Sequence, residues 1–251
     1  MSAIRVFIGY DASEVAAFHT LSQSIMENTT VPTAITPINL SQLNGFYHRP
    51  PHHLASTEFS FSRFLVPFLA DYQGWAIFTD CDMLCRSDLA ELWDLRDEQY
   101  AVQVVKHEHK PVNKLKFNAN IQTRYEKKNW SSVMLLNCGL CNALTLEYVN
   151  SATGLELHQF NWLSDEKLIG ELPGSWNHLV GYDLYDQNAN LVHFTEGGPY
   201  FSPYRDCDYA EEWFDVFNRT HSVIEAGEPS HVESLTPKHV TPITNPLPAP
   251  Q

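Results

Sequence analysis

Short apolar runs alternate with helical patterns along the first hundred residues of this chain. Residues 4–9 and 75–79 are rich in β-branched and aromatic side chains, which is typical of buried strands. Between them, apolar positions recur at helical spacing from about 13 to 28, where Ser13 and Asp11 can cap the helix, and again from 60 to 71. The same pattern predicts strands at 33–40, 101–105, 132–136 and 191–195, and helices at about 87–93, 145–151, 164–171 and 208–219. This alternation predicts an α/β fold with a doubly wound, mostly parallel sheet.

Length and composition favour one catalytic domain. The chain has 251 residues, of which 43% are hydrophobic, enough for one sizeable α/β core. Beyond about residue 225 the sequence is dense in proline and short of large apolar side chains. We therefore expect a domain over residues 1–225 and a proline-rich flexible tail over 226–251.

Charge and the N-terminal sequence exclude several classes of partner. The formal net charge is −14, so nucleic acid and anionic membranes would be repelled. The chain begins MSAIRVFIGYD, which lacks the pattern of a secretory signal, and it has no apolar stretch of roughly 18 residues that could span a bilayer. Its five cysteines are an odd number. We expect reduced thiols and a cytoplasmic enzyme.

Asp80-Cys81-Asp82 is the strongest candidate for chemistry in the sequence. Two carboxylates two positions apart, where a buried strand breaks into a turn, can face one hard cation such as Mn²⁺ or Mg²⁺. The spacing occurs again in Asp206-Cys207-Asp208, which precedes a helical pattern and is expected to cap a helix. The sequence context therefore favours the first copy as the metal site.

Two further features bear on metal binding. His193 lies in an apolar strand, where a lone histidine is usually a hydrogen-bonded core residue, but Gly197 and Gly198 follow and would let backbone approach a bound group. Cys81, Cys85, Cys138 and Cys141 have spacings that also occur in zinc sites. Because strand residues rather than turn glycines separate these cysteines, small buried hydrophobes are the better interpretation.

The order of several short segments resembles glycosyltransferase family 8, the group of glycogenin and the bacterial lipooligosaccharide galactosyltransferases. These segments are a first strand ending in Asp11, Arg63 on a helix, FTDCDM, LLNCGL, SDEKLIGELPGSWN and HFTEGGPY. The resemblance implies the GT-A fold, a single Rossmann-like domain with a mostly parallel mixed sheet. It also implies that Asp80, Asp82 and His193 ligate Mn²⁺ (or Mg²⁺).

The same resemblance implies donor-binding and catalytic residues. The expected donor-binding residues are Gly9, Tyr10, Asp11, Arg63, Asp80, Gly139 and Gly198, with Asp11 on the nucleotide base and Arg63 on phosphate or sugar. Asn137 and Gly139 match a segment that lines the sugar pocket. Asp165 and Glu166 match an Asp-Gln pair beside the donor sugar.

Two positions depart from the family pattern. Glu166 replaces the glutamine of that pair, so it could stabilise positive charge on the anomeric carbon, act as a nucleophile, or be merely solvated beside a capping Asp165. Gly198 stands where the family has a lysine that neutralises the diphosphate. Arg205, Lys106 or another base from residues 106–128 is a candidate substitute.

The resemblance therefore implies a metal-dependent glycosyltransferase. We expect it to move a hexose from a nucleotide-diphosphate sugar, preferably a UDP-sugar, to a saccharide or other hydroxyl acceptor, with retention of configuration. One alternative is a sugar-phosphate nucleotidyltransferase, although the loop after the first strand has neither the glycine run nor the arginine typical of such enzymes. Another is a non-catalytic carbohydrate- or nucleotide-binding protein on the same fold.

Overall fold

The computed structural model describes residues 3–49, 57–108 and 127–222 of the chain. Residues Met1–Thr220 form one compact unit, and His221–Gln251 form a second, nearly all of which lies outside the described residues. The proline-rich segment 226–251 is among the residues not described. A domain boundary at residue 225 therefore stays a prediction.

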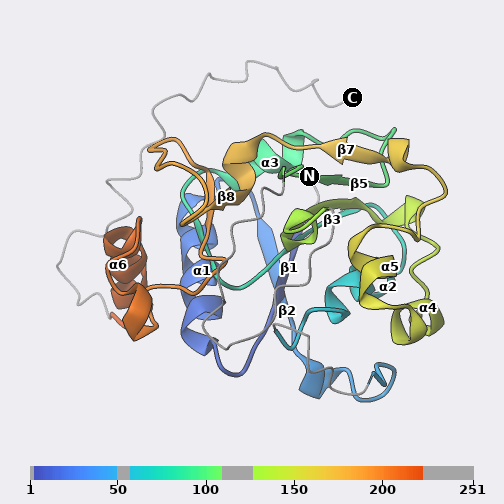
Figure 1. The fold of residues 1–251 in the computed structure, drawn as a ribbon, viewed down its shortest axis with the longest axis horizontal. Helices are drawn as coiled ribbons and strands as arrows, with labels where there is room; N and C mark the ends of the chain where they lie inside the picture. Colours follow the sequence, from blue (N-terminus) through green and yellow to red (C-terminus); the bar gives the residue numbers. More distant parts are fainter. Residues whose placement is uncertain (1–2, 50–56, 109–126, 223–251) are drawn as a thin grey trace, which may run out of the picture. The chain divides into compact units, whose positions relative to one another are not determined.

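A six-stranded sheet forms the centre of the first unit (Figure 1). Its strands are β1 (Ile4–Gly9), β2 (Thr33–Ile38), β3 (Trp75–Thr79), β5 (Val102–Val104), β6 (Val133–Asn137) and β7 (Ile169–Glu171). They lie in the order β2-β1-β3-β6-β5-β7, and β6 runs antiparallel to its neighbours β3 and β5 while the other pairs are parallel. The predicted α/β fold with a mostly parallel mixed sheet is confirmed.

A second, three-stranded sheet lies beyond the end of β3. It contains β4 (Met83–Cys85), β8 (His178–Leu179) and β9 (Leu191–His193) in the order β4-β9-β8. Only three residues separate β3 from β4, so Asp80-Cys81-Asp82 is the link between the two sheets. The prediction of a strand at 191–195 covers β9, whereas β4 and β8, of three and two residues, are too short to leave a clear alternation in the sequence.

Within the described residues, six α-helices flank the sheets. They are α1 (Val15–Asn28), α2 (Val66–Leu69), α3 (Leu89–Asp94), α4 (Leu146–Ser151), α5 (Gly154–His158) and α6 (Ala210–Thr220). Figure 1 shows α1 and α6 on one side of the six-stranded sheet and α2, α4 and α5 on the other. The connections β1-α1-β2 and β2-α2-β3 cross the sheet in opposite directions, and crossovers of the usual right hand then place α1 and α2 on opposite faces. Arg219 of α6 donates two hydrogen bonds to Glu27 of α1, at 2.8 and 2.7 Å, and so joins these helices.

Two predicted helices differ from the structure. The helix expected at 164–171 is wrong: a 3-10 helix, Glu166–Leu168, leads directly into β7. Pairing of β7 with β5 overrides the helical pattern, and Gly170 permits it because a Cβ there would lie 2.5 Å from the ring of Tyr100. The helix expected at 60–71 is divided into a 3-10 helix, Ser62–Leu65, and α2, which has Pro67 in its first turn.

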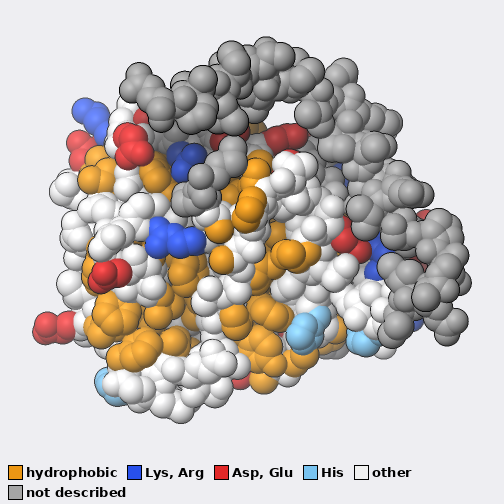
Figure 2. Space-filling model, turned by 180° about the vertical axis from the view of Figure 1, so that it is seen from behind, with side chains coloured by type: hydrophobic (Ala, Val, Ile, Leu, Met, Phe, Trp, Pro, Cys, Tyr) orange, Lys and Arg blue, Asp and Glu red, His pale blue; other side chains and the backbone are white. Residues whose placement is uncertain are grey.

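The face turned away from the viewer in Figure 1 is shown in Figure 2. Apolar side chains gather across its lower half, and charged side chains are scattered above and around them. Within the described parts of the chain, no helix combines the length and the apolar character needed to cross a bilayer.

Candidate active site

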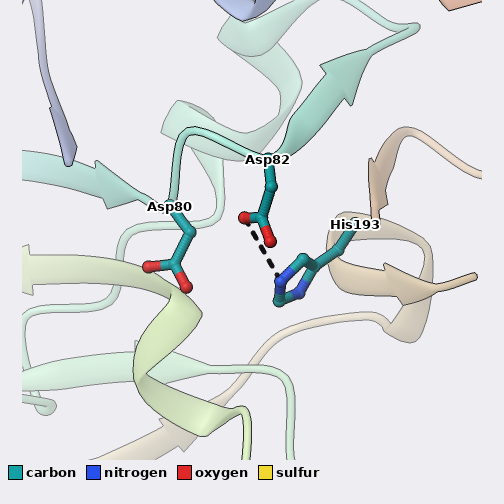
Figure 3. Close-up of side chains that lie close together, drawn as sticks. All are labelled: Asp80, Asp82 and His193. Carbon is teal, nitrogen blue, oxygen red and sulfur yellow. Dashed lines mark ion pairs between the residues drawn. The ribbon is translucent and has the colours of Figure 1, made fainter. Parts of the chain in front are cut away.

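Two aspartates lie at the turn that joins the two sheets. The Asp80 N–H donates to the carbonyl of Ser132, at 2.9 Å, just before β6 begins. Asp82 directly precedes β4, in which Met83 pairs with His193 of β9. The step from one sheet to the other therefore turns both carboxylates towards the imidazole (Figure 3).

The three side chains form a candidate site for a divalent cation. One ligand atom from each of Asp80, Asp82 and His193 lies within 4.8 Å of the other two. Asp82 Oδ1 is 3.5 Å from His193 Nε2. Carboxylate oxygens combined with an imidazole nitrogen suit Mn²⁺ or Mg²⁺, so the residues present fit the cation that the sequence implied. Among the described residues, this is the one group of three or more acidic, histidine or cysteine side chains with that geometry.

Arg63 fixes one of these carboxylates. Its Nη1 is 2.7 Å from Asp80 Oδ1 and also donates to the carbonyl of Ser131 at 3.0 Å. The guanidinium lies against the rings of Phe59 and Phe78, 5.2 and 5.1 Å from their centroids, and the residue is 5% exposed. A buried charge needs such partners, so Arg63 and Asp80 orient each other.

The surroundings of the aspartates carry a surplus of negative charge. Burial first, and then the charge of Asp82, raises the pKa of Glu14 to about 7. The Tyr200 hydroxyl donates to Glu14 at 2.6 Å, and burial, with Asp82 and Glu14 adding to it, raises the pKa of Tyr200 well above its usual value. These shifts indicate a negative potential, which favours a bound cation. Neither Glu14 nor Tyr200 was predicted from the sequence, because no motif marks them.

The end of β1 lies beside the aspartates. Parallel pairing of Ile8 with Thr79 brings Gly9, Tyr10 and Asp11 to the same edge of the sheet as Asp80. Asp11 is 7% exposed, and its carboxylate accepts hydrogen bonds from the N–H groups of residues 13 and 58, at 2.8 and 3.0 Å. This carboxylate therefore holds the β1 loop to the segment that leads to Arg63. It does not cap α1, whose N-terminus has no side-chain cap.

Gly9 and Tyr10 complete this edge. A Cβ on Gly9 would lie 2.3 Å from the Phe59 ring, so the glycine makes room for the ring that supports Arg63. Tyr10 packs edge-on against Phe18, with ring centroids 5.4 Å apart.

Asn137 and Gly139 lie elsewhere. In the antiparallel pairing of β3 with β6, Asn137 is opposite Trp75, whereas the residue opposite Thr79, next to Asp80, is Val133. Asn137 donates to Glu98 at 3.0 Å. The structure therefore brings Ser131 and Ser132, rather than Asn137 and Gly139, to the aspartates, because successive rows of a strand are separated by roughly 3.3 Å.

Glu166 begins the short 3-10 helix before β7, and Asp165 directly precedes it. The Asp165 carboxylate accepts from the Lys167 N–H at 2.9 Å and so caps this helix. The Glu166 side chain is 81% exposed and forms an ion pair with Lys127. The hydrogen bond from Lys127, and then its charge, lower the pKa of the Glu166 carboxyl. Among the described residues, the charges that act on Glu166 are Lys127, Asp165 and Lys106. No described contact joins it to the two aspartates.

The Tyr200 ring occupies the space that a side chain at position 198 would need. A Cβ on Gly198 would lie 2.1 Å from Cε1 of the Tyr200 ring, so no side chain fits there while the tyrosine holds this position. Arg205 and Lys106, the two named candidates to replace the family's lysine, each lie against an aromatic ring other than that of Tyr200. Arg205 is exposed and stacks on Phe214 at 4.5 Å, and the Lys106 Nζ is 5.9 Å from the Trp130 ring. Residues 109–126 lie outside the described part of the chain.

The competing metal motifs find no support in the described residues. Asp206 and Asp208 of the second Asp-Cys-Asp are exposed and belong to no cluster of ligands there. Cys81, Cys85, Cys138 and Cys141 are buried free thiols that form no such cluster either. Burial raises the pKa of Cys138 to about 11 and that of Cys85 to about 12, so these groups stay protonated.

A cavity of about 410 Å³ opens beyond the carboxyl ends of β5 and β7. It is lined by residues from both strand ends, from the 3-10 helix Gly174–Asn177, and from β8 and the segment after it. They are Val105, Lys106, His107, Glu108, Glu171, Leu172, Gly174, Ser175, His178, Asp183 and Asp186. Burial lowers the pKa of the cavity residue His107 to about 4, and His193 is among the groups that act on it.

Comparison with known proteins identifies the family. Residues 2–139 match the profile of Glycosyl transferase family 8. Protein CDI of Arabidopsis thaliana is 45% identical over 220 residues, which cover 84% of this chain and 85% of that protein. The chain belongs to glycosyl transferase family 8. It is thus a glycosyltransferase, which displaces the nucleotidyltransferase and the non-catalytic alternatives.

Solved structures of glycosyltransferases share the fold. The bifunctional glycosyltransferase WbbM has a TM-score of 0.60 and 15% identity, with 86% of this chain and 50% of that chain covered. The galactosyltransferase LgtC, in complex with donor and acceptor sugar analogues, has a TM-score of 0.55 and 14% identity, with 88% and 98% covered. The chain therefore spans half of WbbM and nearly all of LgtC, and its GT-A fold is confirmed.

Proposed function

We propose that this glycosyltransferase moves a hexose from a UDP-sugar to a hydroxyl acceptor, with retention of configuration and with Mn²⁺ or Mg²⁺ held by Asp80, Asp82 and His193. The single observation that carries this proposal is the convergence of the three ligand atoms within 4.8 Å at the edge of the sheet where α/β enzymes bind ligands. A cation bound there would neutralise the negative charge of the departing diphosphate.

The chain's own residues have distinct proposed roles around the donor. Gly9, Tyr10 and Asp11 form the wall at the end of β1, where the nucleotide base would bind. Arg63 holds Asp80 in place and so acts on the cation site through that carboxylate. Ser131 and Ser132 take the place beside the donor sugar that the sequence resemblance assigned to Asn137 and Gly139.

The cavity beyond β5 and β7 is the proposed acceptor site. Glu108, Glu171, Asp183 and Asp186 outnumber Lys106, which is the one lysine or arginine among its lining residues. Carboxylates accept hydrogen bonds from hydroxyl groups and repel anions. We therefore propose a neutral, hydroxyl-rich acceptor, such as a saccharide, in preference to a phosphorylated one.

A thermal-shift experiment tests the donor and cation together. The protein is heated with UDP, GDP or CMP, or with their sugars, each with and without Mn²⁺. A ligand that binds only the folded state raises the melting temperature. We expect UDP and a UDP-sugar to raise it when Mn²⁺ is present and to have little effect without it, because the acidic site repels a bare diphosphate. A shift with GDP or CMP instead would reassign the donor, and no shift with any nucleotide would contradict the proposal.

A further inference from the structure

Asn177 is a fully buried amide between the two sheets. It ends the 3-10 helix Gly174–Asn177, just before β8, and its exposed fraction is 0%. Its Nδ2 donates to the carbonyl of Asn129 at 3.1 Å and to the Ser132 hydroxyl at 2.9 Å, while its Oδ1 lies 3.0 Å from His193 Nδ1. All the hydrogen-bonding atoms of the amide are therefore engaged by groups distant from it in sequence.

These partners fix the orientation of the amide. A backbone carbonyl can only accept, so the group that faces Asn129 must be the NH₂ group, and Oδ1 must face the imidazole. Because Oδ1 accepts, Nδ1 of His193 must carry the proton in the neutral ring. The lone pair is then on Nε2, the atom 3.5 Å from Asp82 Oδ1. Two lone-pair atoms face each other there, an arrangement that a cation between them would stabilise.

The same contacts join the histidine to the other ligands. The carbonyl of Ser132 accepts from the Asp80 N–H at 2.9 Å, and its hydroxyl accepts from Asn177 at 2.9 Å. Asp80 extends from the six-stranded sheet, whereas His193 belongs to the three-stranded sheet. Asn177 thus connects both sheets at the point where their ligands converge.

We propose that Asn177 is the positioning residue of this site, which holds the proton on Nδ1 of His193 and thereby presents Nε2 as a ligand atom. The inference rests on the proposed cation site. Groups that orient a ligating histidine in this way typically change metal affinity by about 10- to 100-fold when removed. A purely structural amide would lower stability without this effect.

Asn150 offers a matched control. Its Nδ2 donates to two backbone carbonyls, those of Phe46 and Leu146, at 2.9 Å each, and its Oδ1 accepts from the His48 N–H at 2.7 Å. It lies in α4 and makes the same number of side-chain hydrogen bonds as Asn177, with none to a proposed ligand. Asn150→Ala therefore reproduces the loss of a bridging amide away from the site.

The test combines NMR of the metal-free protein with Mn²⁺ binding. Long-range ¹H–¹⁵N spectra of the imidazoles report which nitrogen of His193 is protonated, and His193→Gln identifies its signals. We expect Nδ1 to carry the proton in the wild type and in Asn150→Ala, and this preference to be lost in Asn177→Ala. Titration with Mn²⁺ alone, followed by electron paramagnetic resonance, should give a Kd about 10- to 100-fold higher for Asn177→Ala and an unchanged Kd for Asn150→Ala.

A wild-type His193 protonated on Nε2 would overturn the inference, and this result does not depend on whether Asn177→Ala folds. A folded Asn177→Ala that binds Mn²⁺ like the wild type would overturn it as well. If the wild type binds no Mn²⁺, the proposed cation site fails, whereas the NMR comparison still decides whether Asn177 sets the histidine tautomer.

Discussion

At the scale of single residues, geometry separates side chains that the sequence treats alike. Asp80-Cys81-Asp82 and Asp206-Cys207-Asp208 have the same letters, but the first links two sheets and faces His193, whereas the second lies exposed before α6. The context of a buried strand was enough to rank the two copies. It could not reveal Asn177, Glu14 or Tyr200, since their partners are distant in sequence.

Asp82→Asn should lower transfer roughly 100-fold or more, because one charged ligand of the proposed cation site is lost. The matched control is Asp208→Asn, the same substitution at the same place in the exposed copy, which should keep wild-type activity. Release of UDP from a UDP-sugar, measured with Mn²⁺ and acceptor, checks both, and circular dichroism checks that each variant is folded. Wild-type activity in Asp82→Asn would remove this residue from the site.

Glu166→Gln should keep activity within a few-fold of the wild type. The carboxylate is exposed and paired with Lys127, so the substitution removes a surface ion pair and no nucleophile. Steady-state kcat and a search by mass spectrometry for a glycosylated enzyme decide the matter. A loss of several orders of magnitude, together with a sugar adduct in the wild type that the variant lacks, would instead support covalent catalysis by Glu166.

At the scale of elements, the long apolar runs were predictable, whereas several short strands, β4, β7 and β8, were not. β1 and β3 have the predicted bounds because their side chains are buried nearly throughout. β7 was expected to be helical, since pairing with β5 decides its structure and no local pattern records that partner. The displacement of Asn137 from the site has the same cause, because its place depends on the register of β6 against β3.

The turn that follows β9 explains a departure from the family pattern and yields a third prediction. Gly198→Ala should lower the free energy of unfolding by about 1–3 kcal/mol, because the new Cβ would lie 2.1 Å from the Tyr200 ring and overpack the turn. Gly45→Ala is the control: a Cβ there would meet nothing within 4 Å. Urea unfolding measures both, and equal stabilities would show that Tyr200 moves aside at little cost.

The proposed acceptor cavity leads to a prediction at the scale of elements, because the ends of β5 and β7 form it. Glu171, the last residue of β7, lines the cavity and is exposed. Glu171→Gln should raise the KM for a neutral saccharide acceptor several-fold while hydrolysis of the donor without acceptor stays unchanged, since hydroxyl groups bond more strongly to a carboxylate than to an amide. An unchanged acceptor KM with normal donor hydrolysis would place the acceptor elsewhere. Loss of donor hydrolysis would instead implicate Glu171 in donor binding.

At the scale of the whole molecule, partly buried histidines connect folding to pH. His158 of α5 lies beside Ser131, whose hydroxyl is 2.8 Å from its Nδ1, so it supports the segment that carries the carbonyl bound by Arg63. Burial, and then the charge of Arg63, lowers the pKa of His158 to about 3. The folded state therefore holds this ring neutral at pH values where the unfolded chain, with a histidine pKa of about 6.5, already binds a proton.

This difference in proton binding determines the direction in which stability changes with pH. The contribution of His158 to stability is complete above about pH 6.5 and decreases as the pH falls towards 3, by at most about 1.4 kcal/mol per pH unit. His107, with a pKa lowered to about 4, acts in the same direction, whereas Glu14, with a pKa raised to about 7, gains a proton on folding and acts in the opposite direction between about pH 7 and 4.5. The contribution of His158 to stability must therefore be measured as the difference between the wild type and a variant that lacks this histidine.

His158→Gln, which keeps a hydrogen-bond acceptor for Ser131, should be less stable than the wild type at pH 7.5 and should lose less stability on acidification. Urea unfolding at pH 7.5, 6.5, 5.5 and 4.5, with EDTA to exclude metal, gives both profiles. The gap between them should shrink below pH 6.5, by at most about 1.4 kcal/mol per pH unit, because the variant lacks the group that protonates on unfolding. Because His107 and Glu14 are present in both proteins, their contributions cancel in this gap. Parallel profiles would mean that the imidazole takes up its proton without unfolding, and thus that the segment around Ser131 opens to water within the folded state.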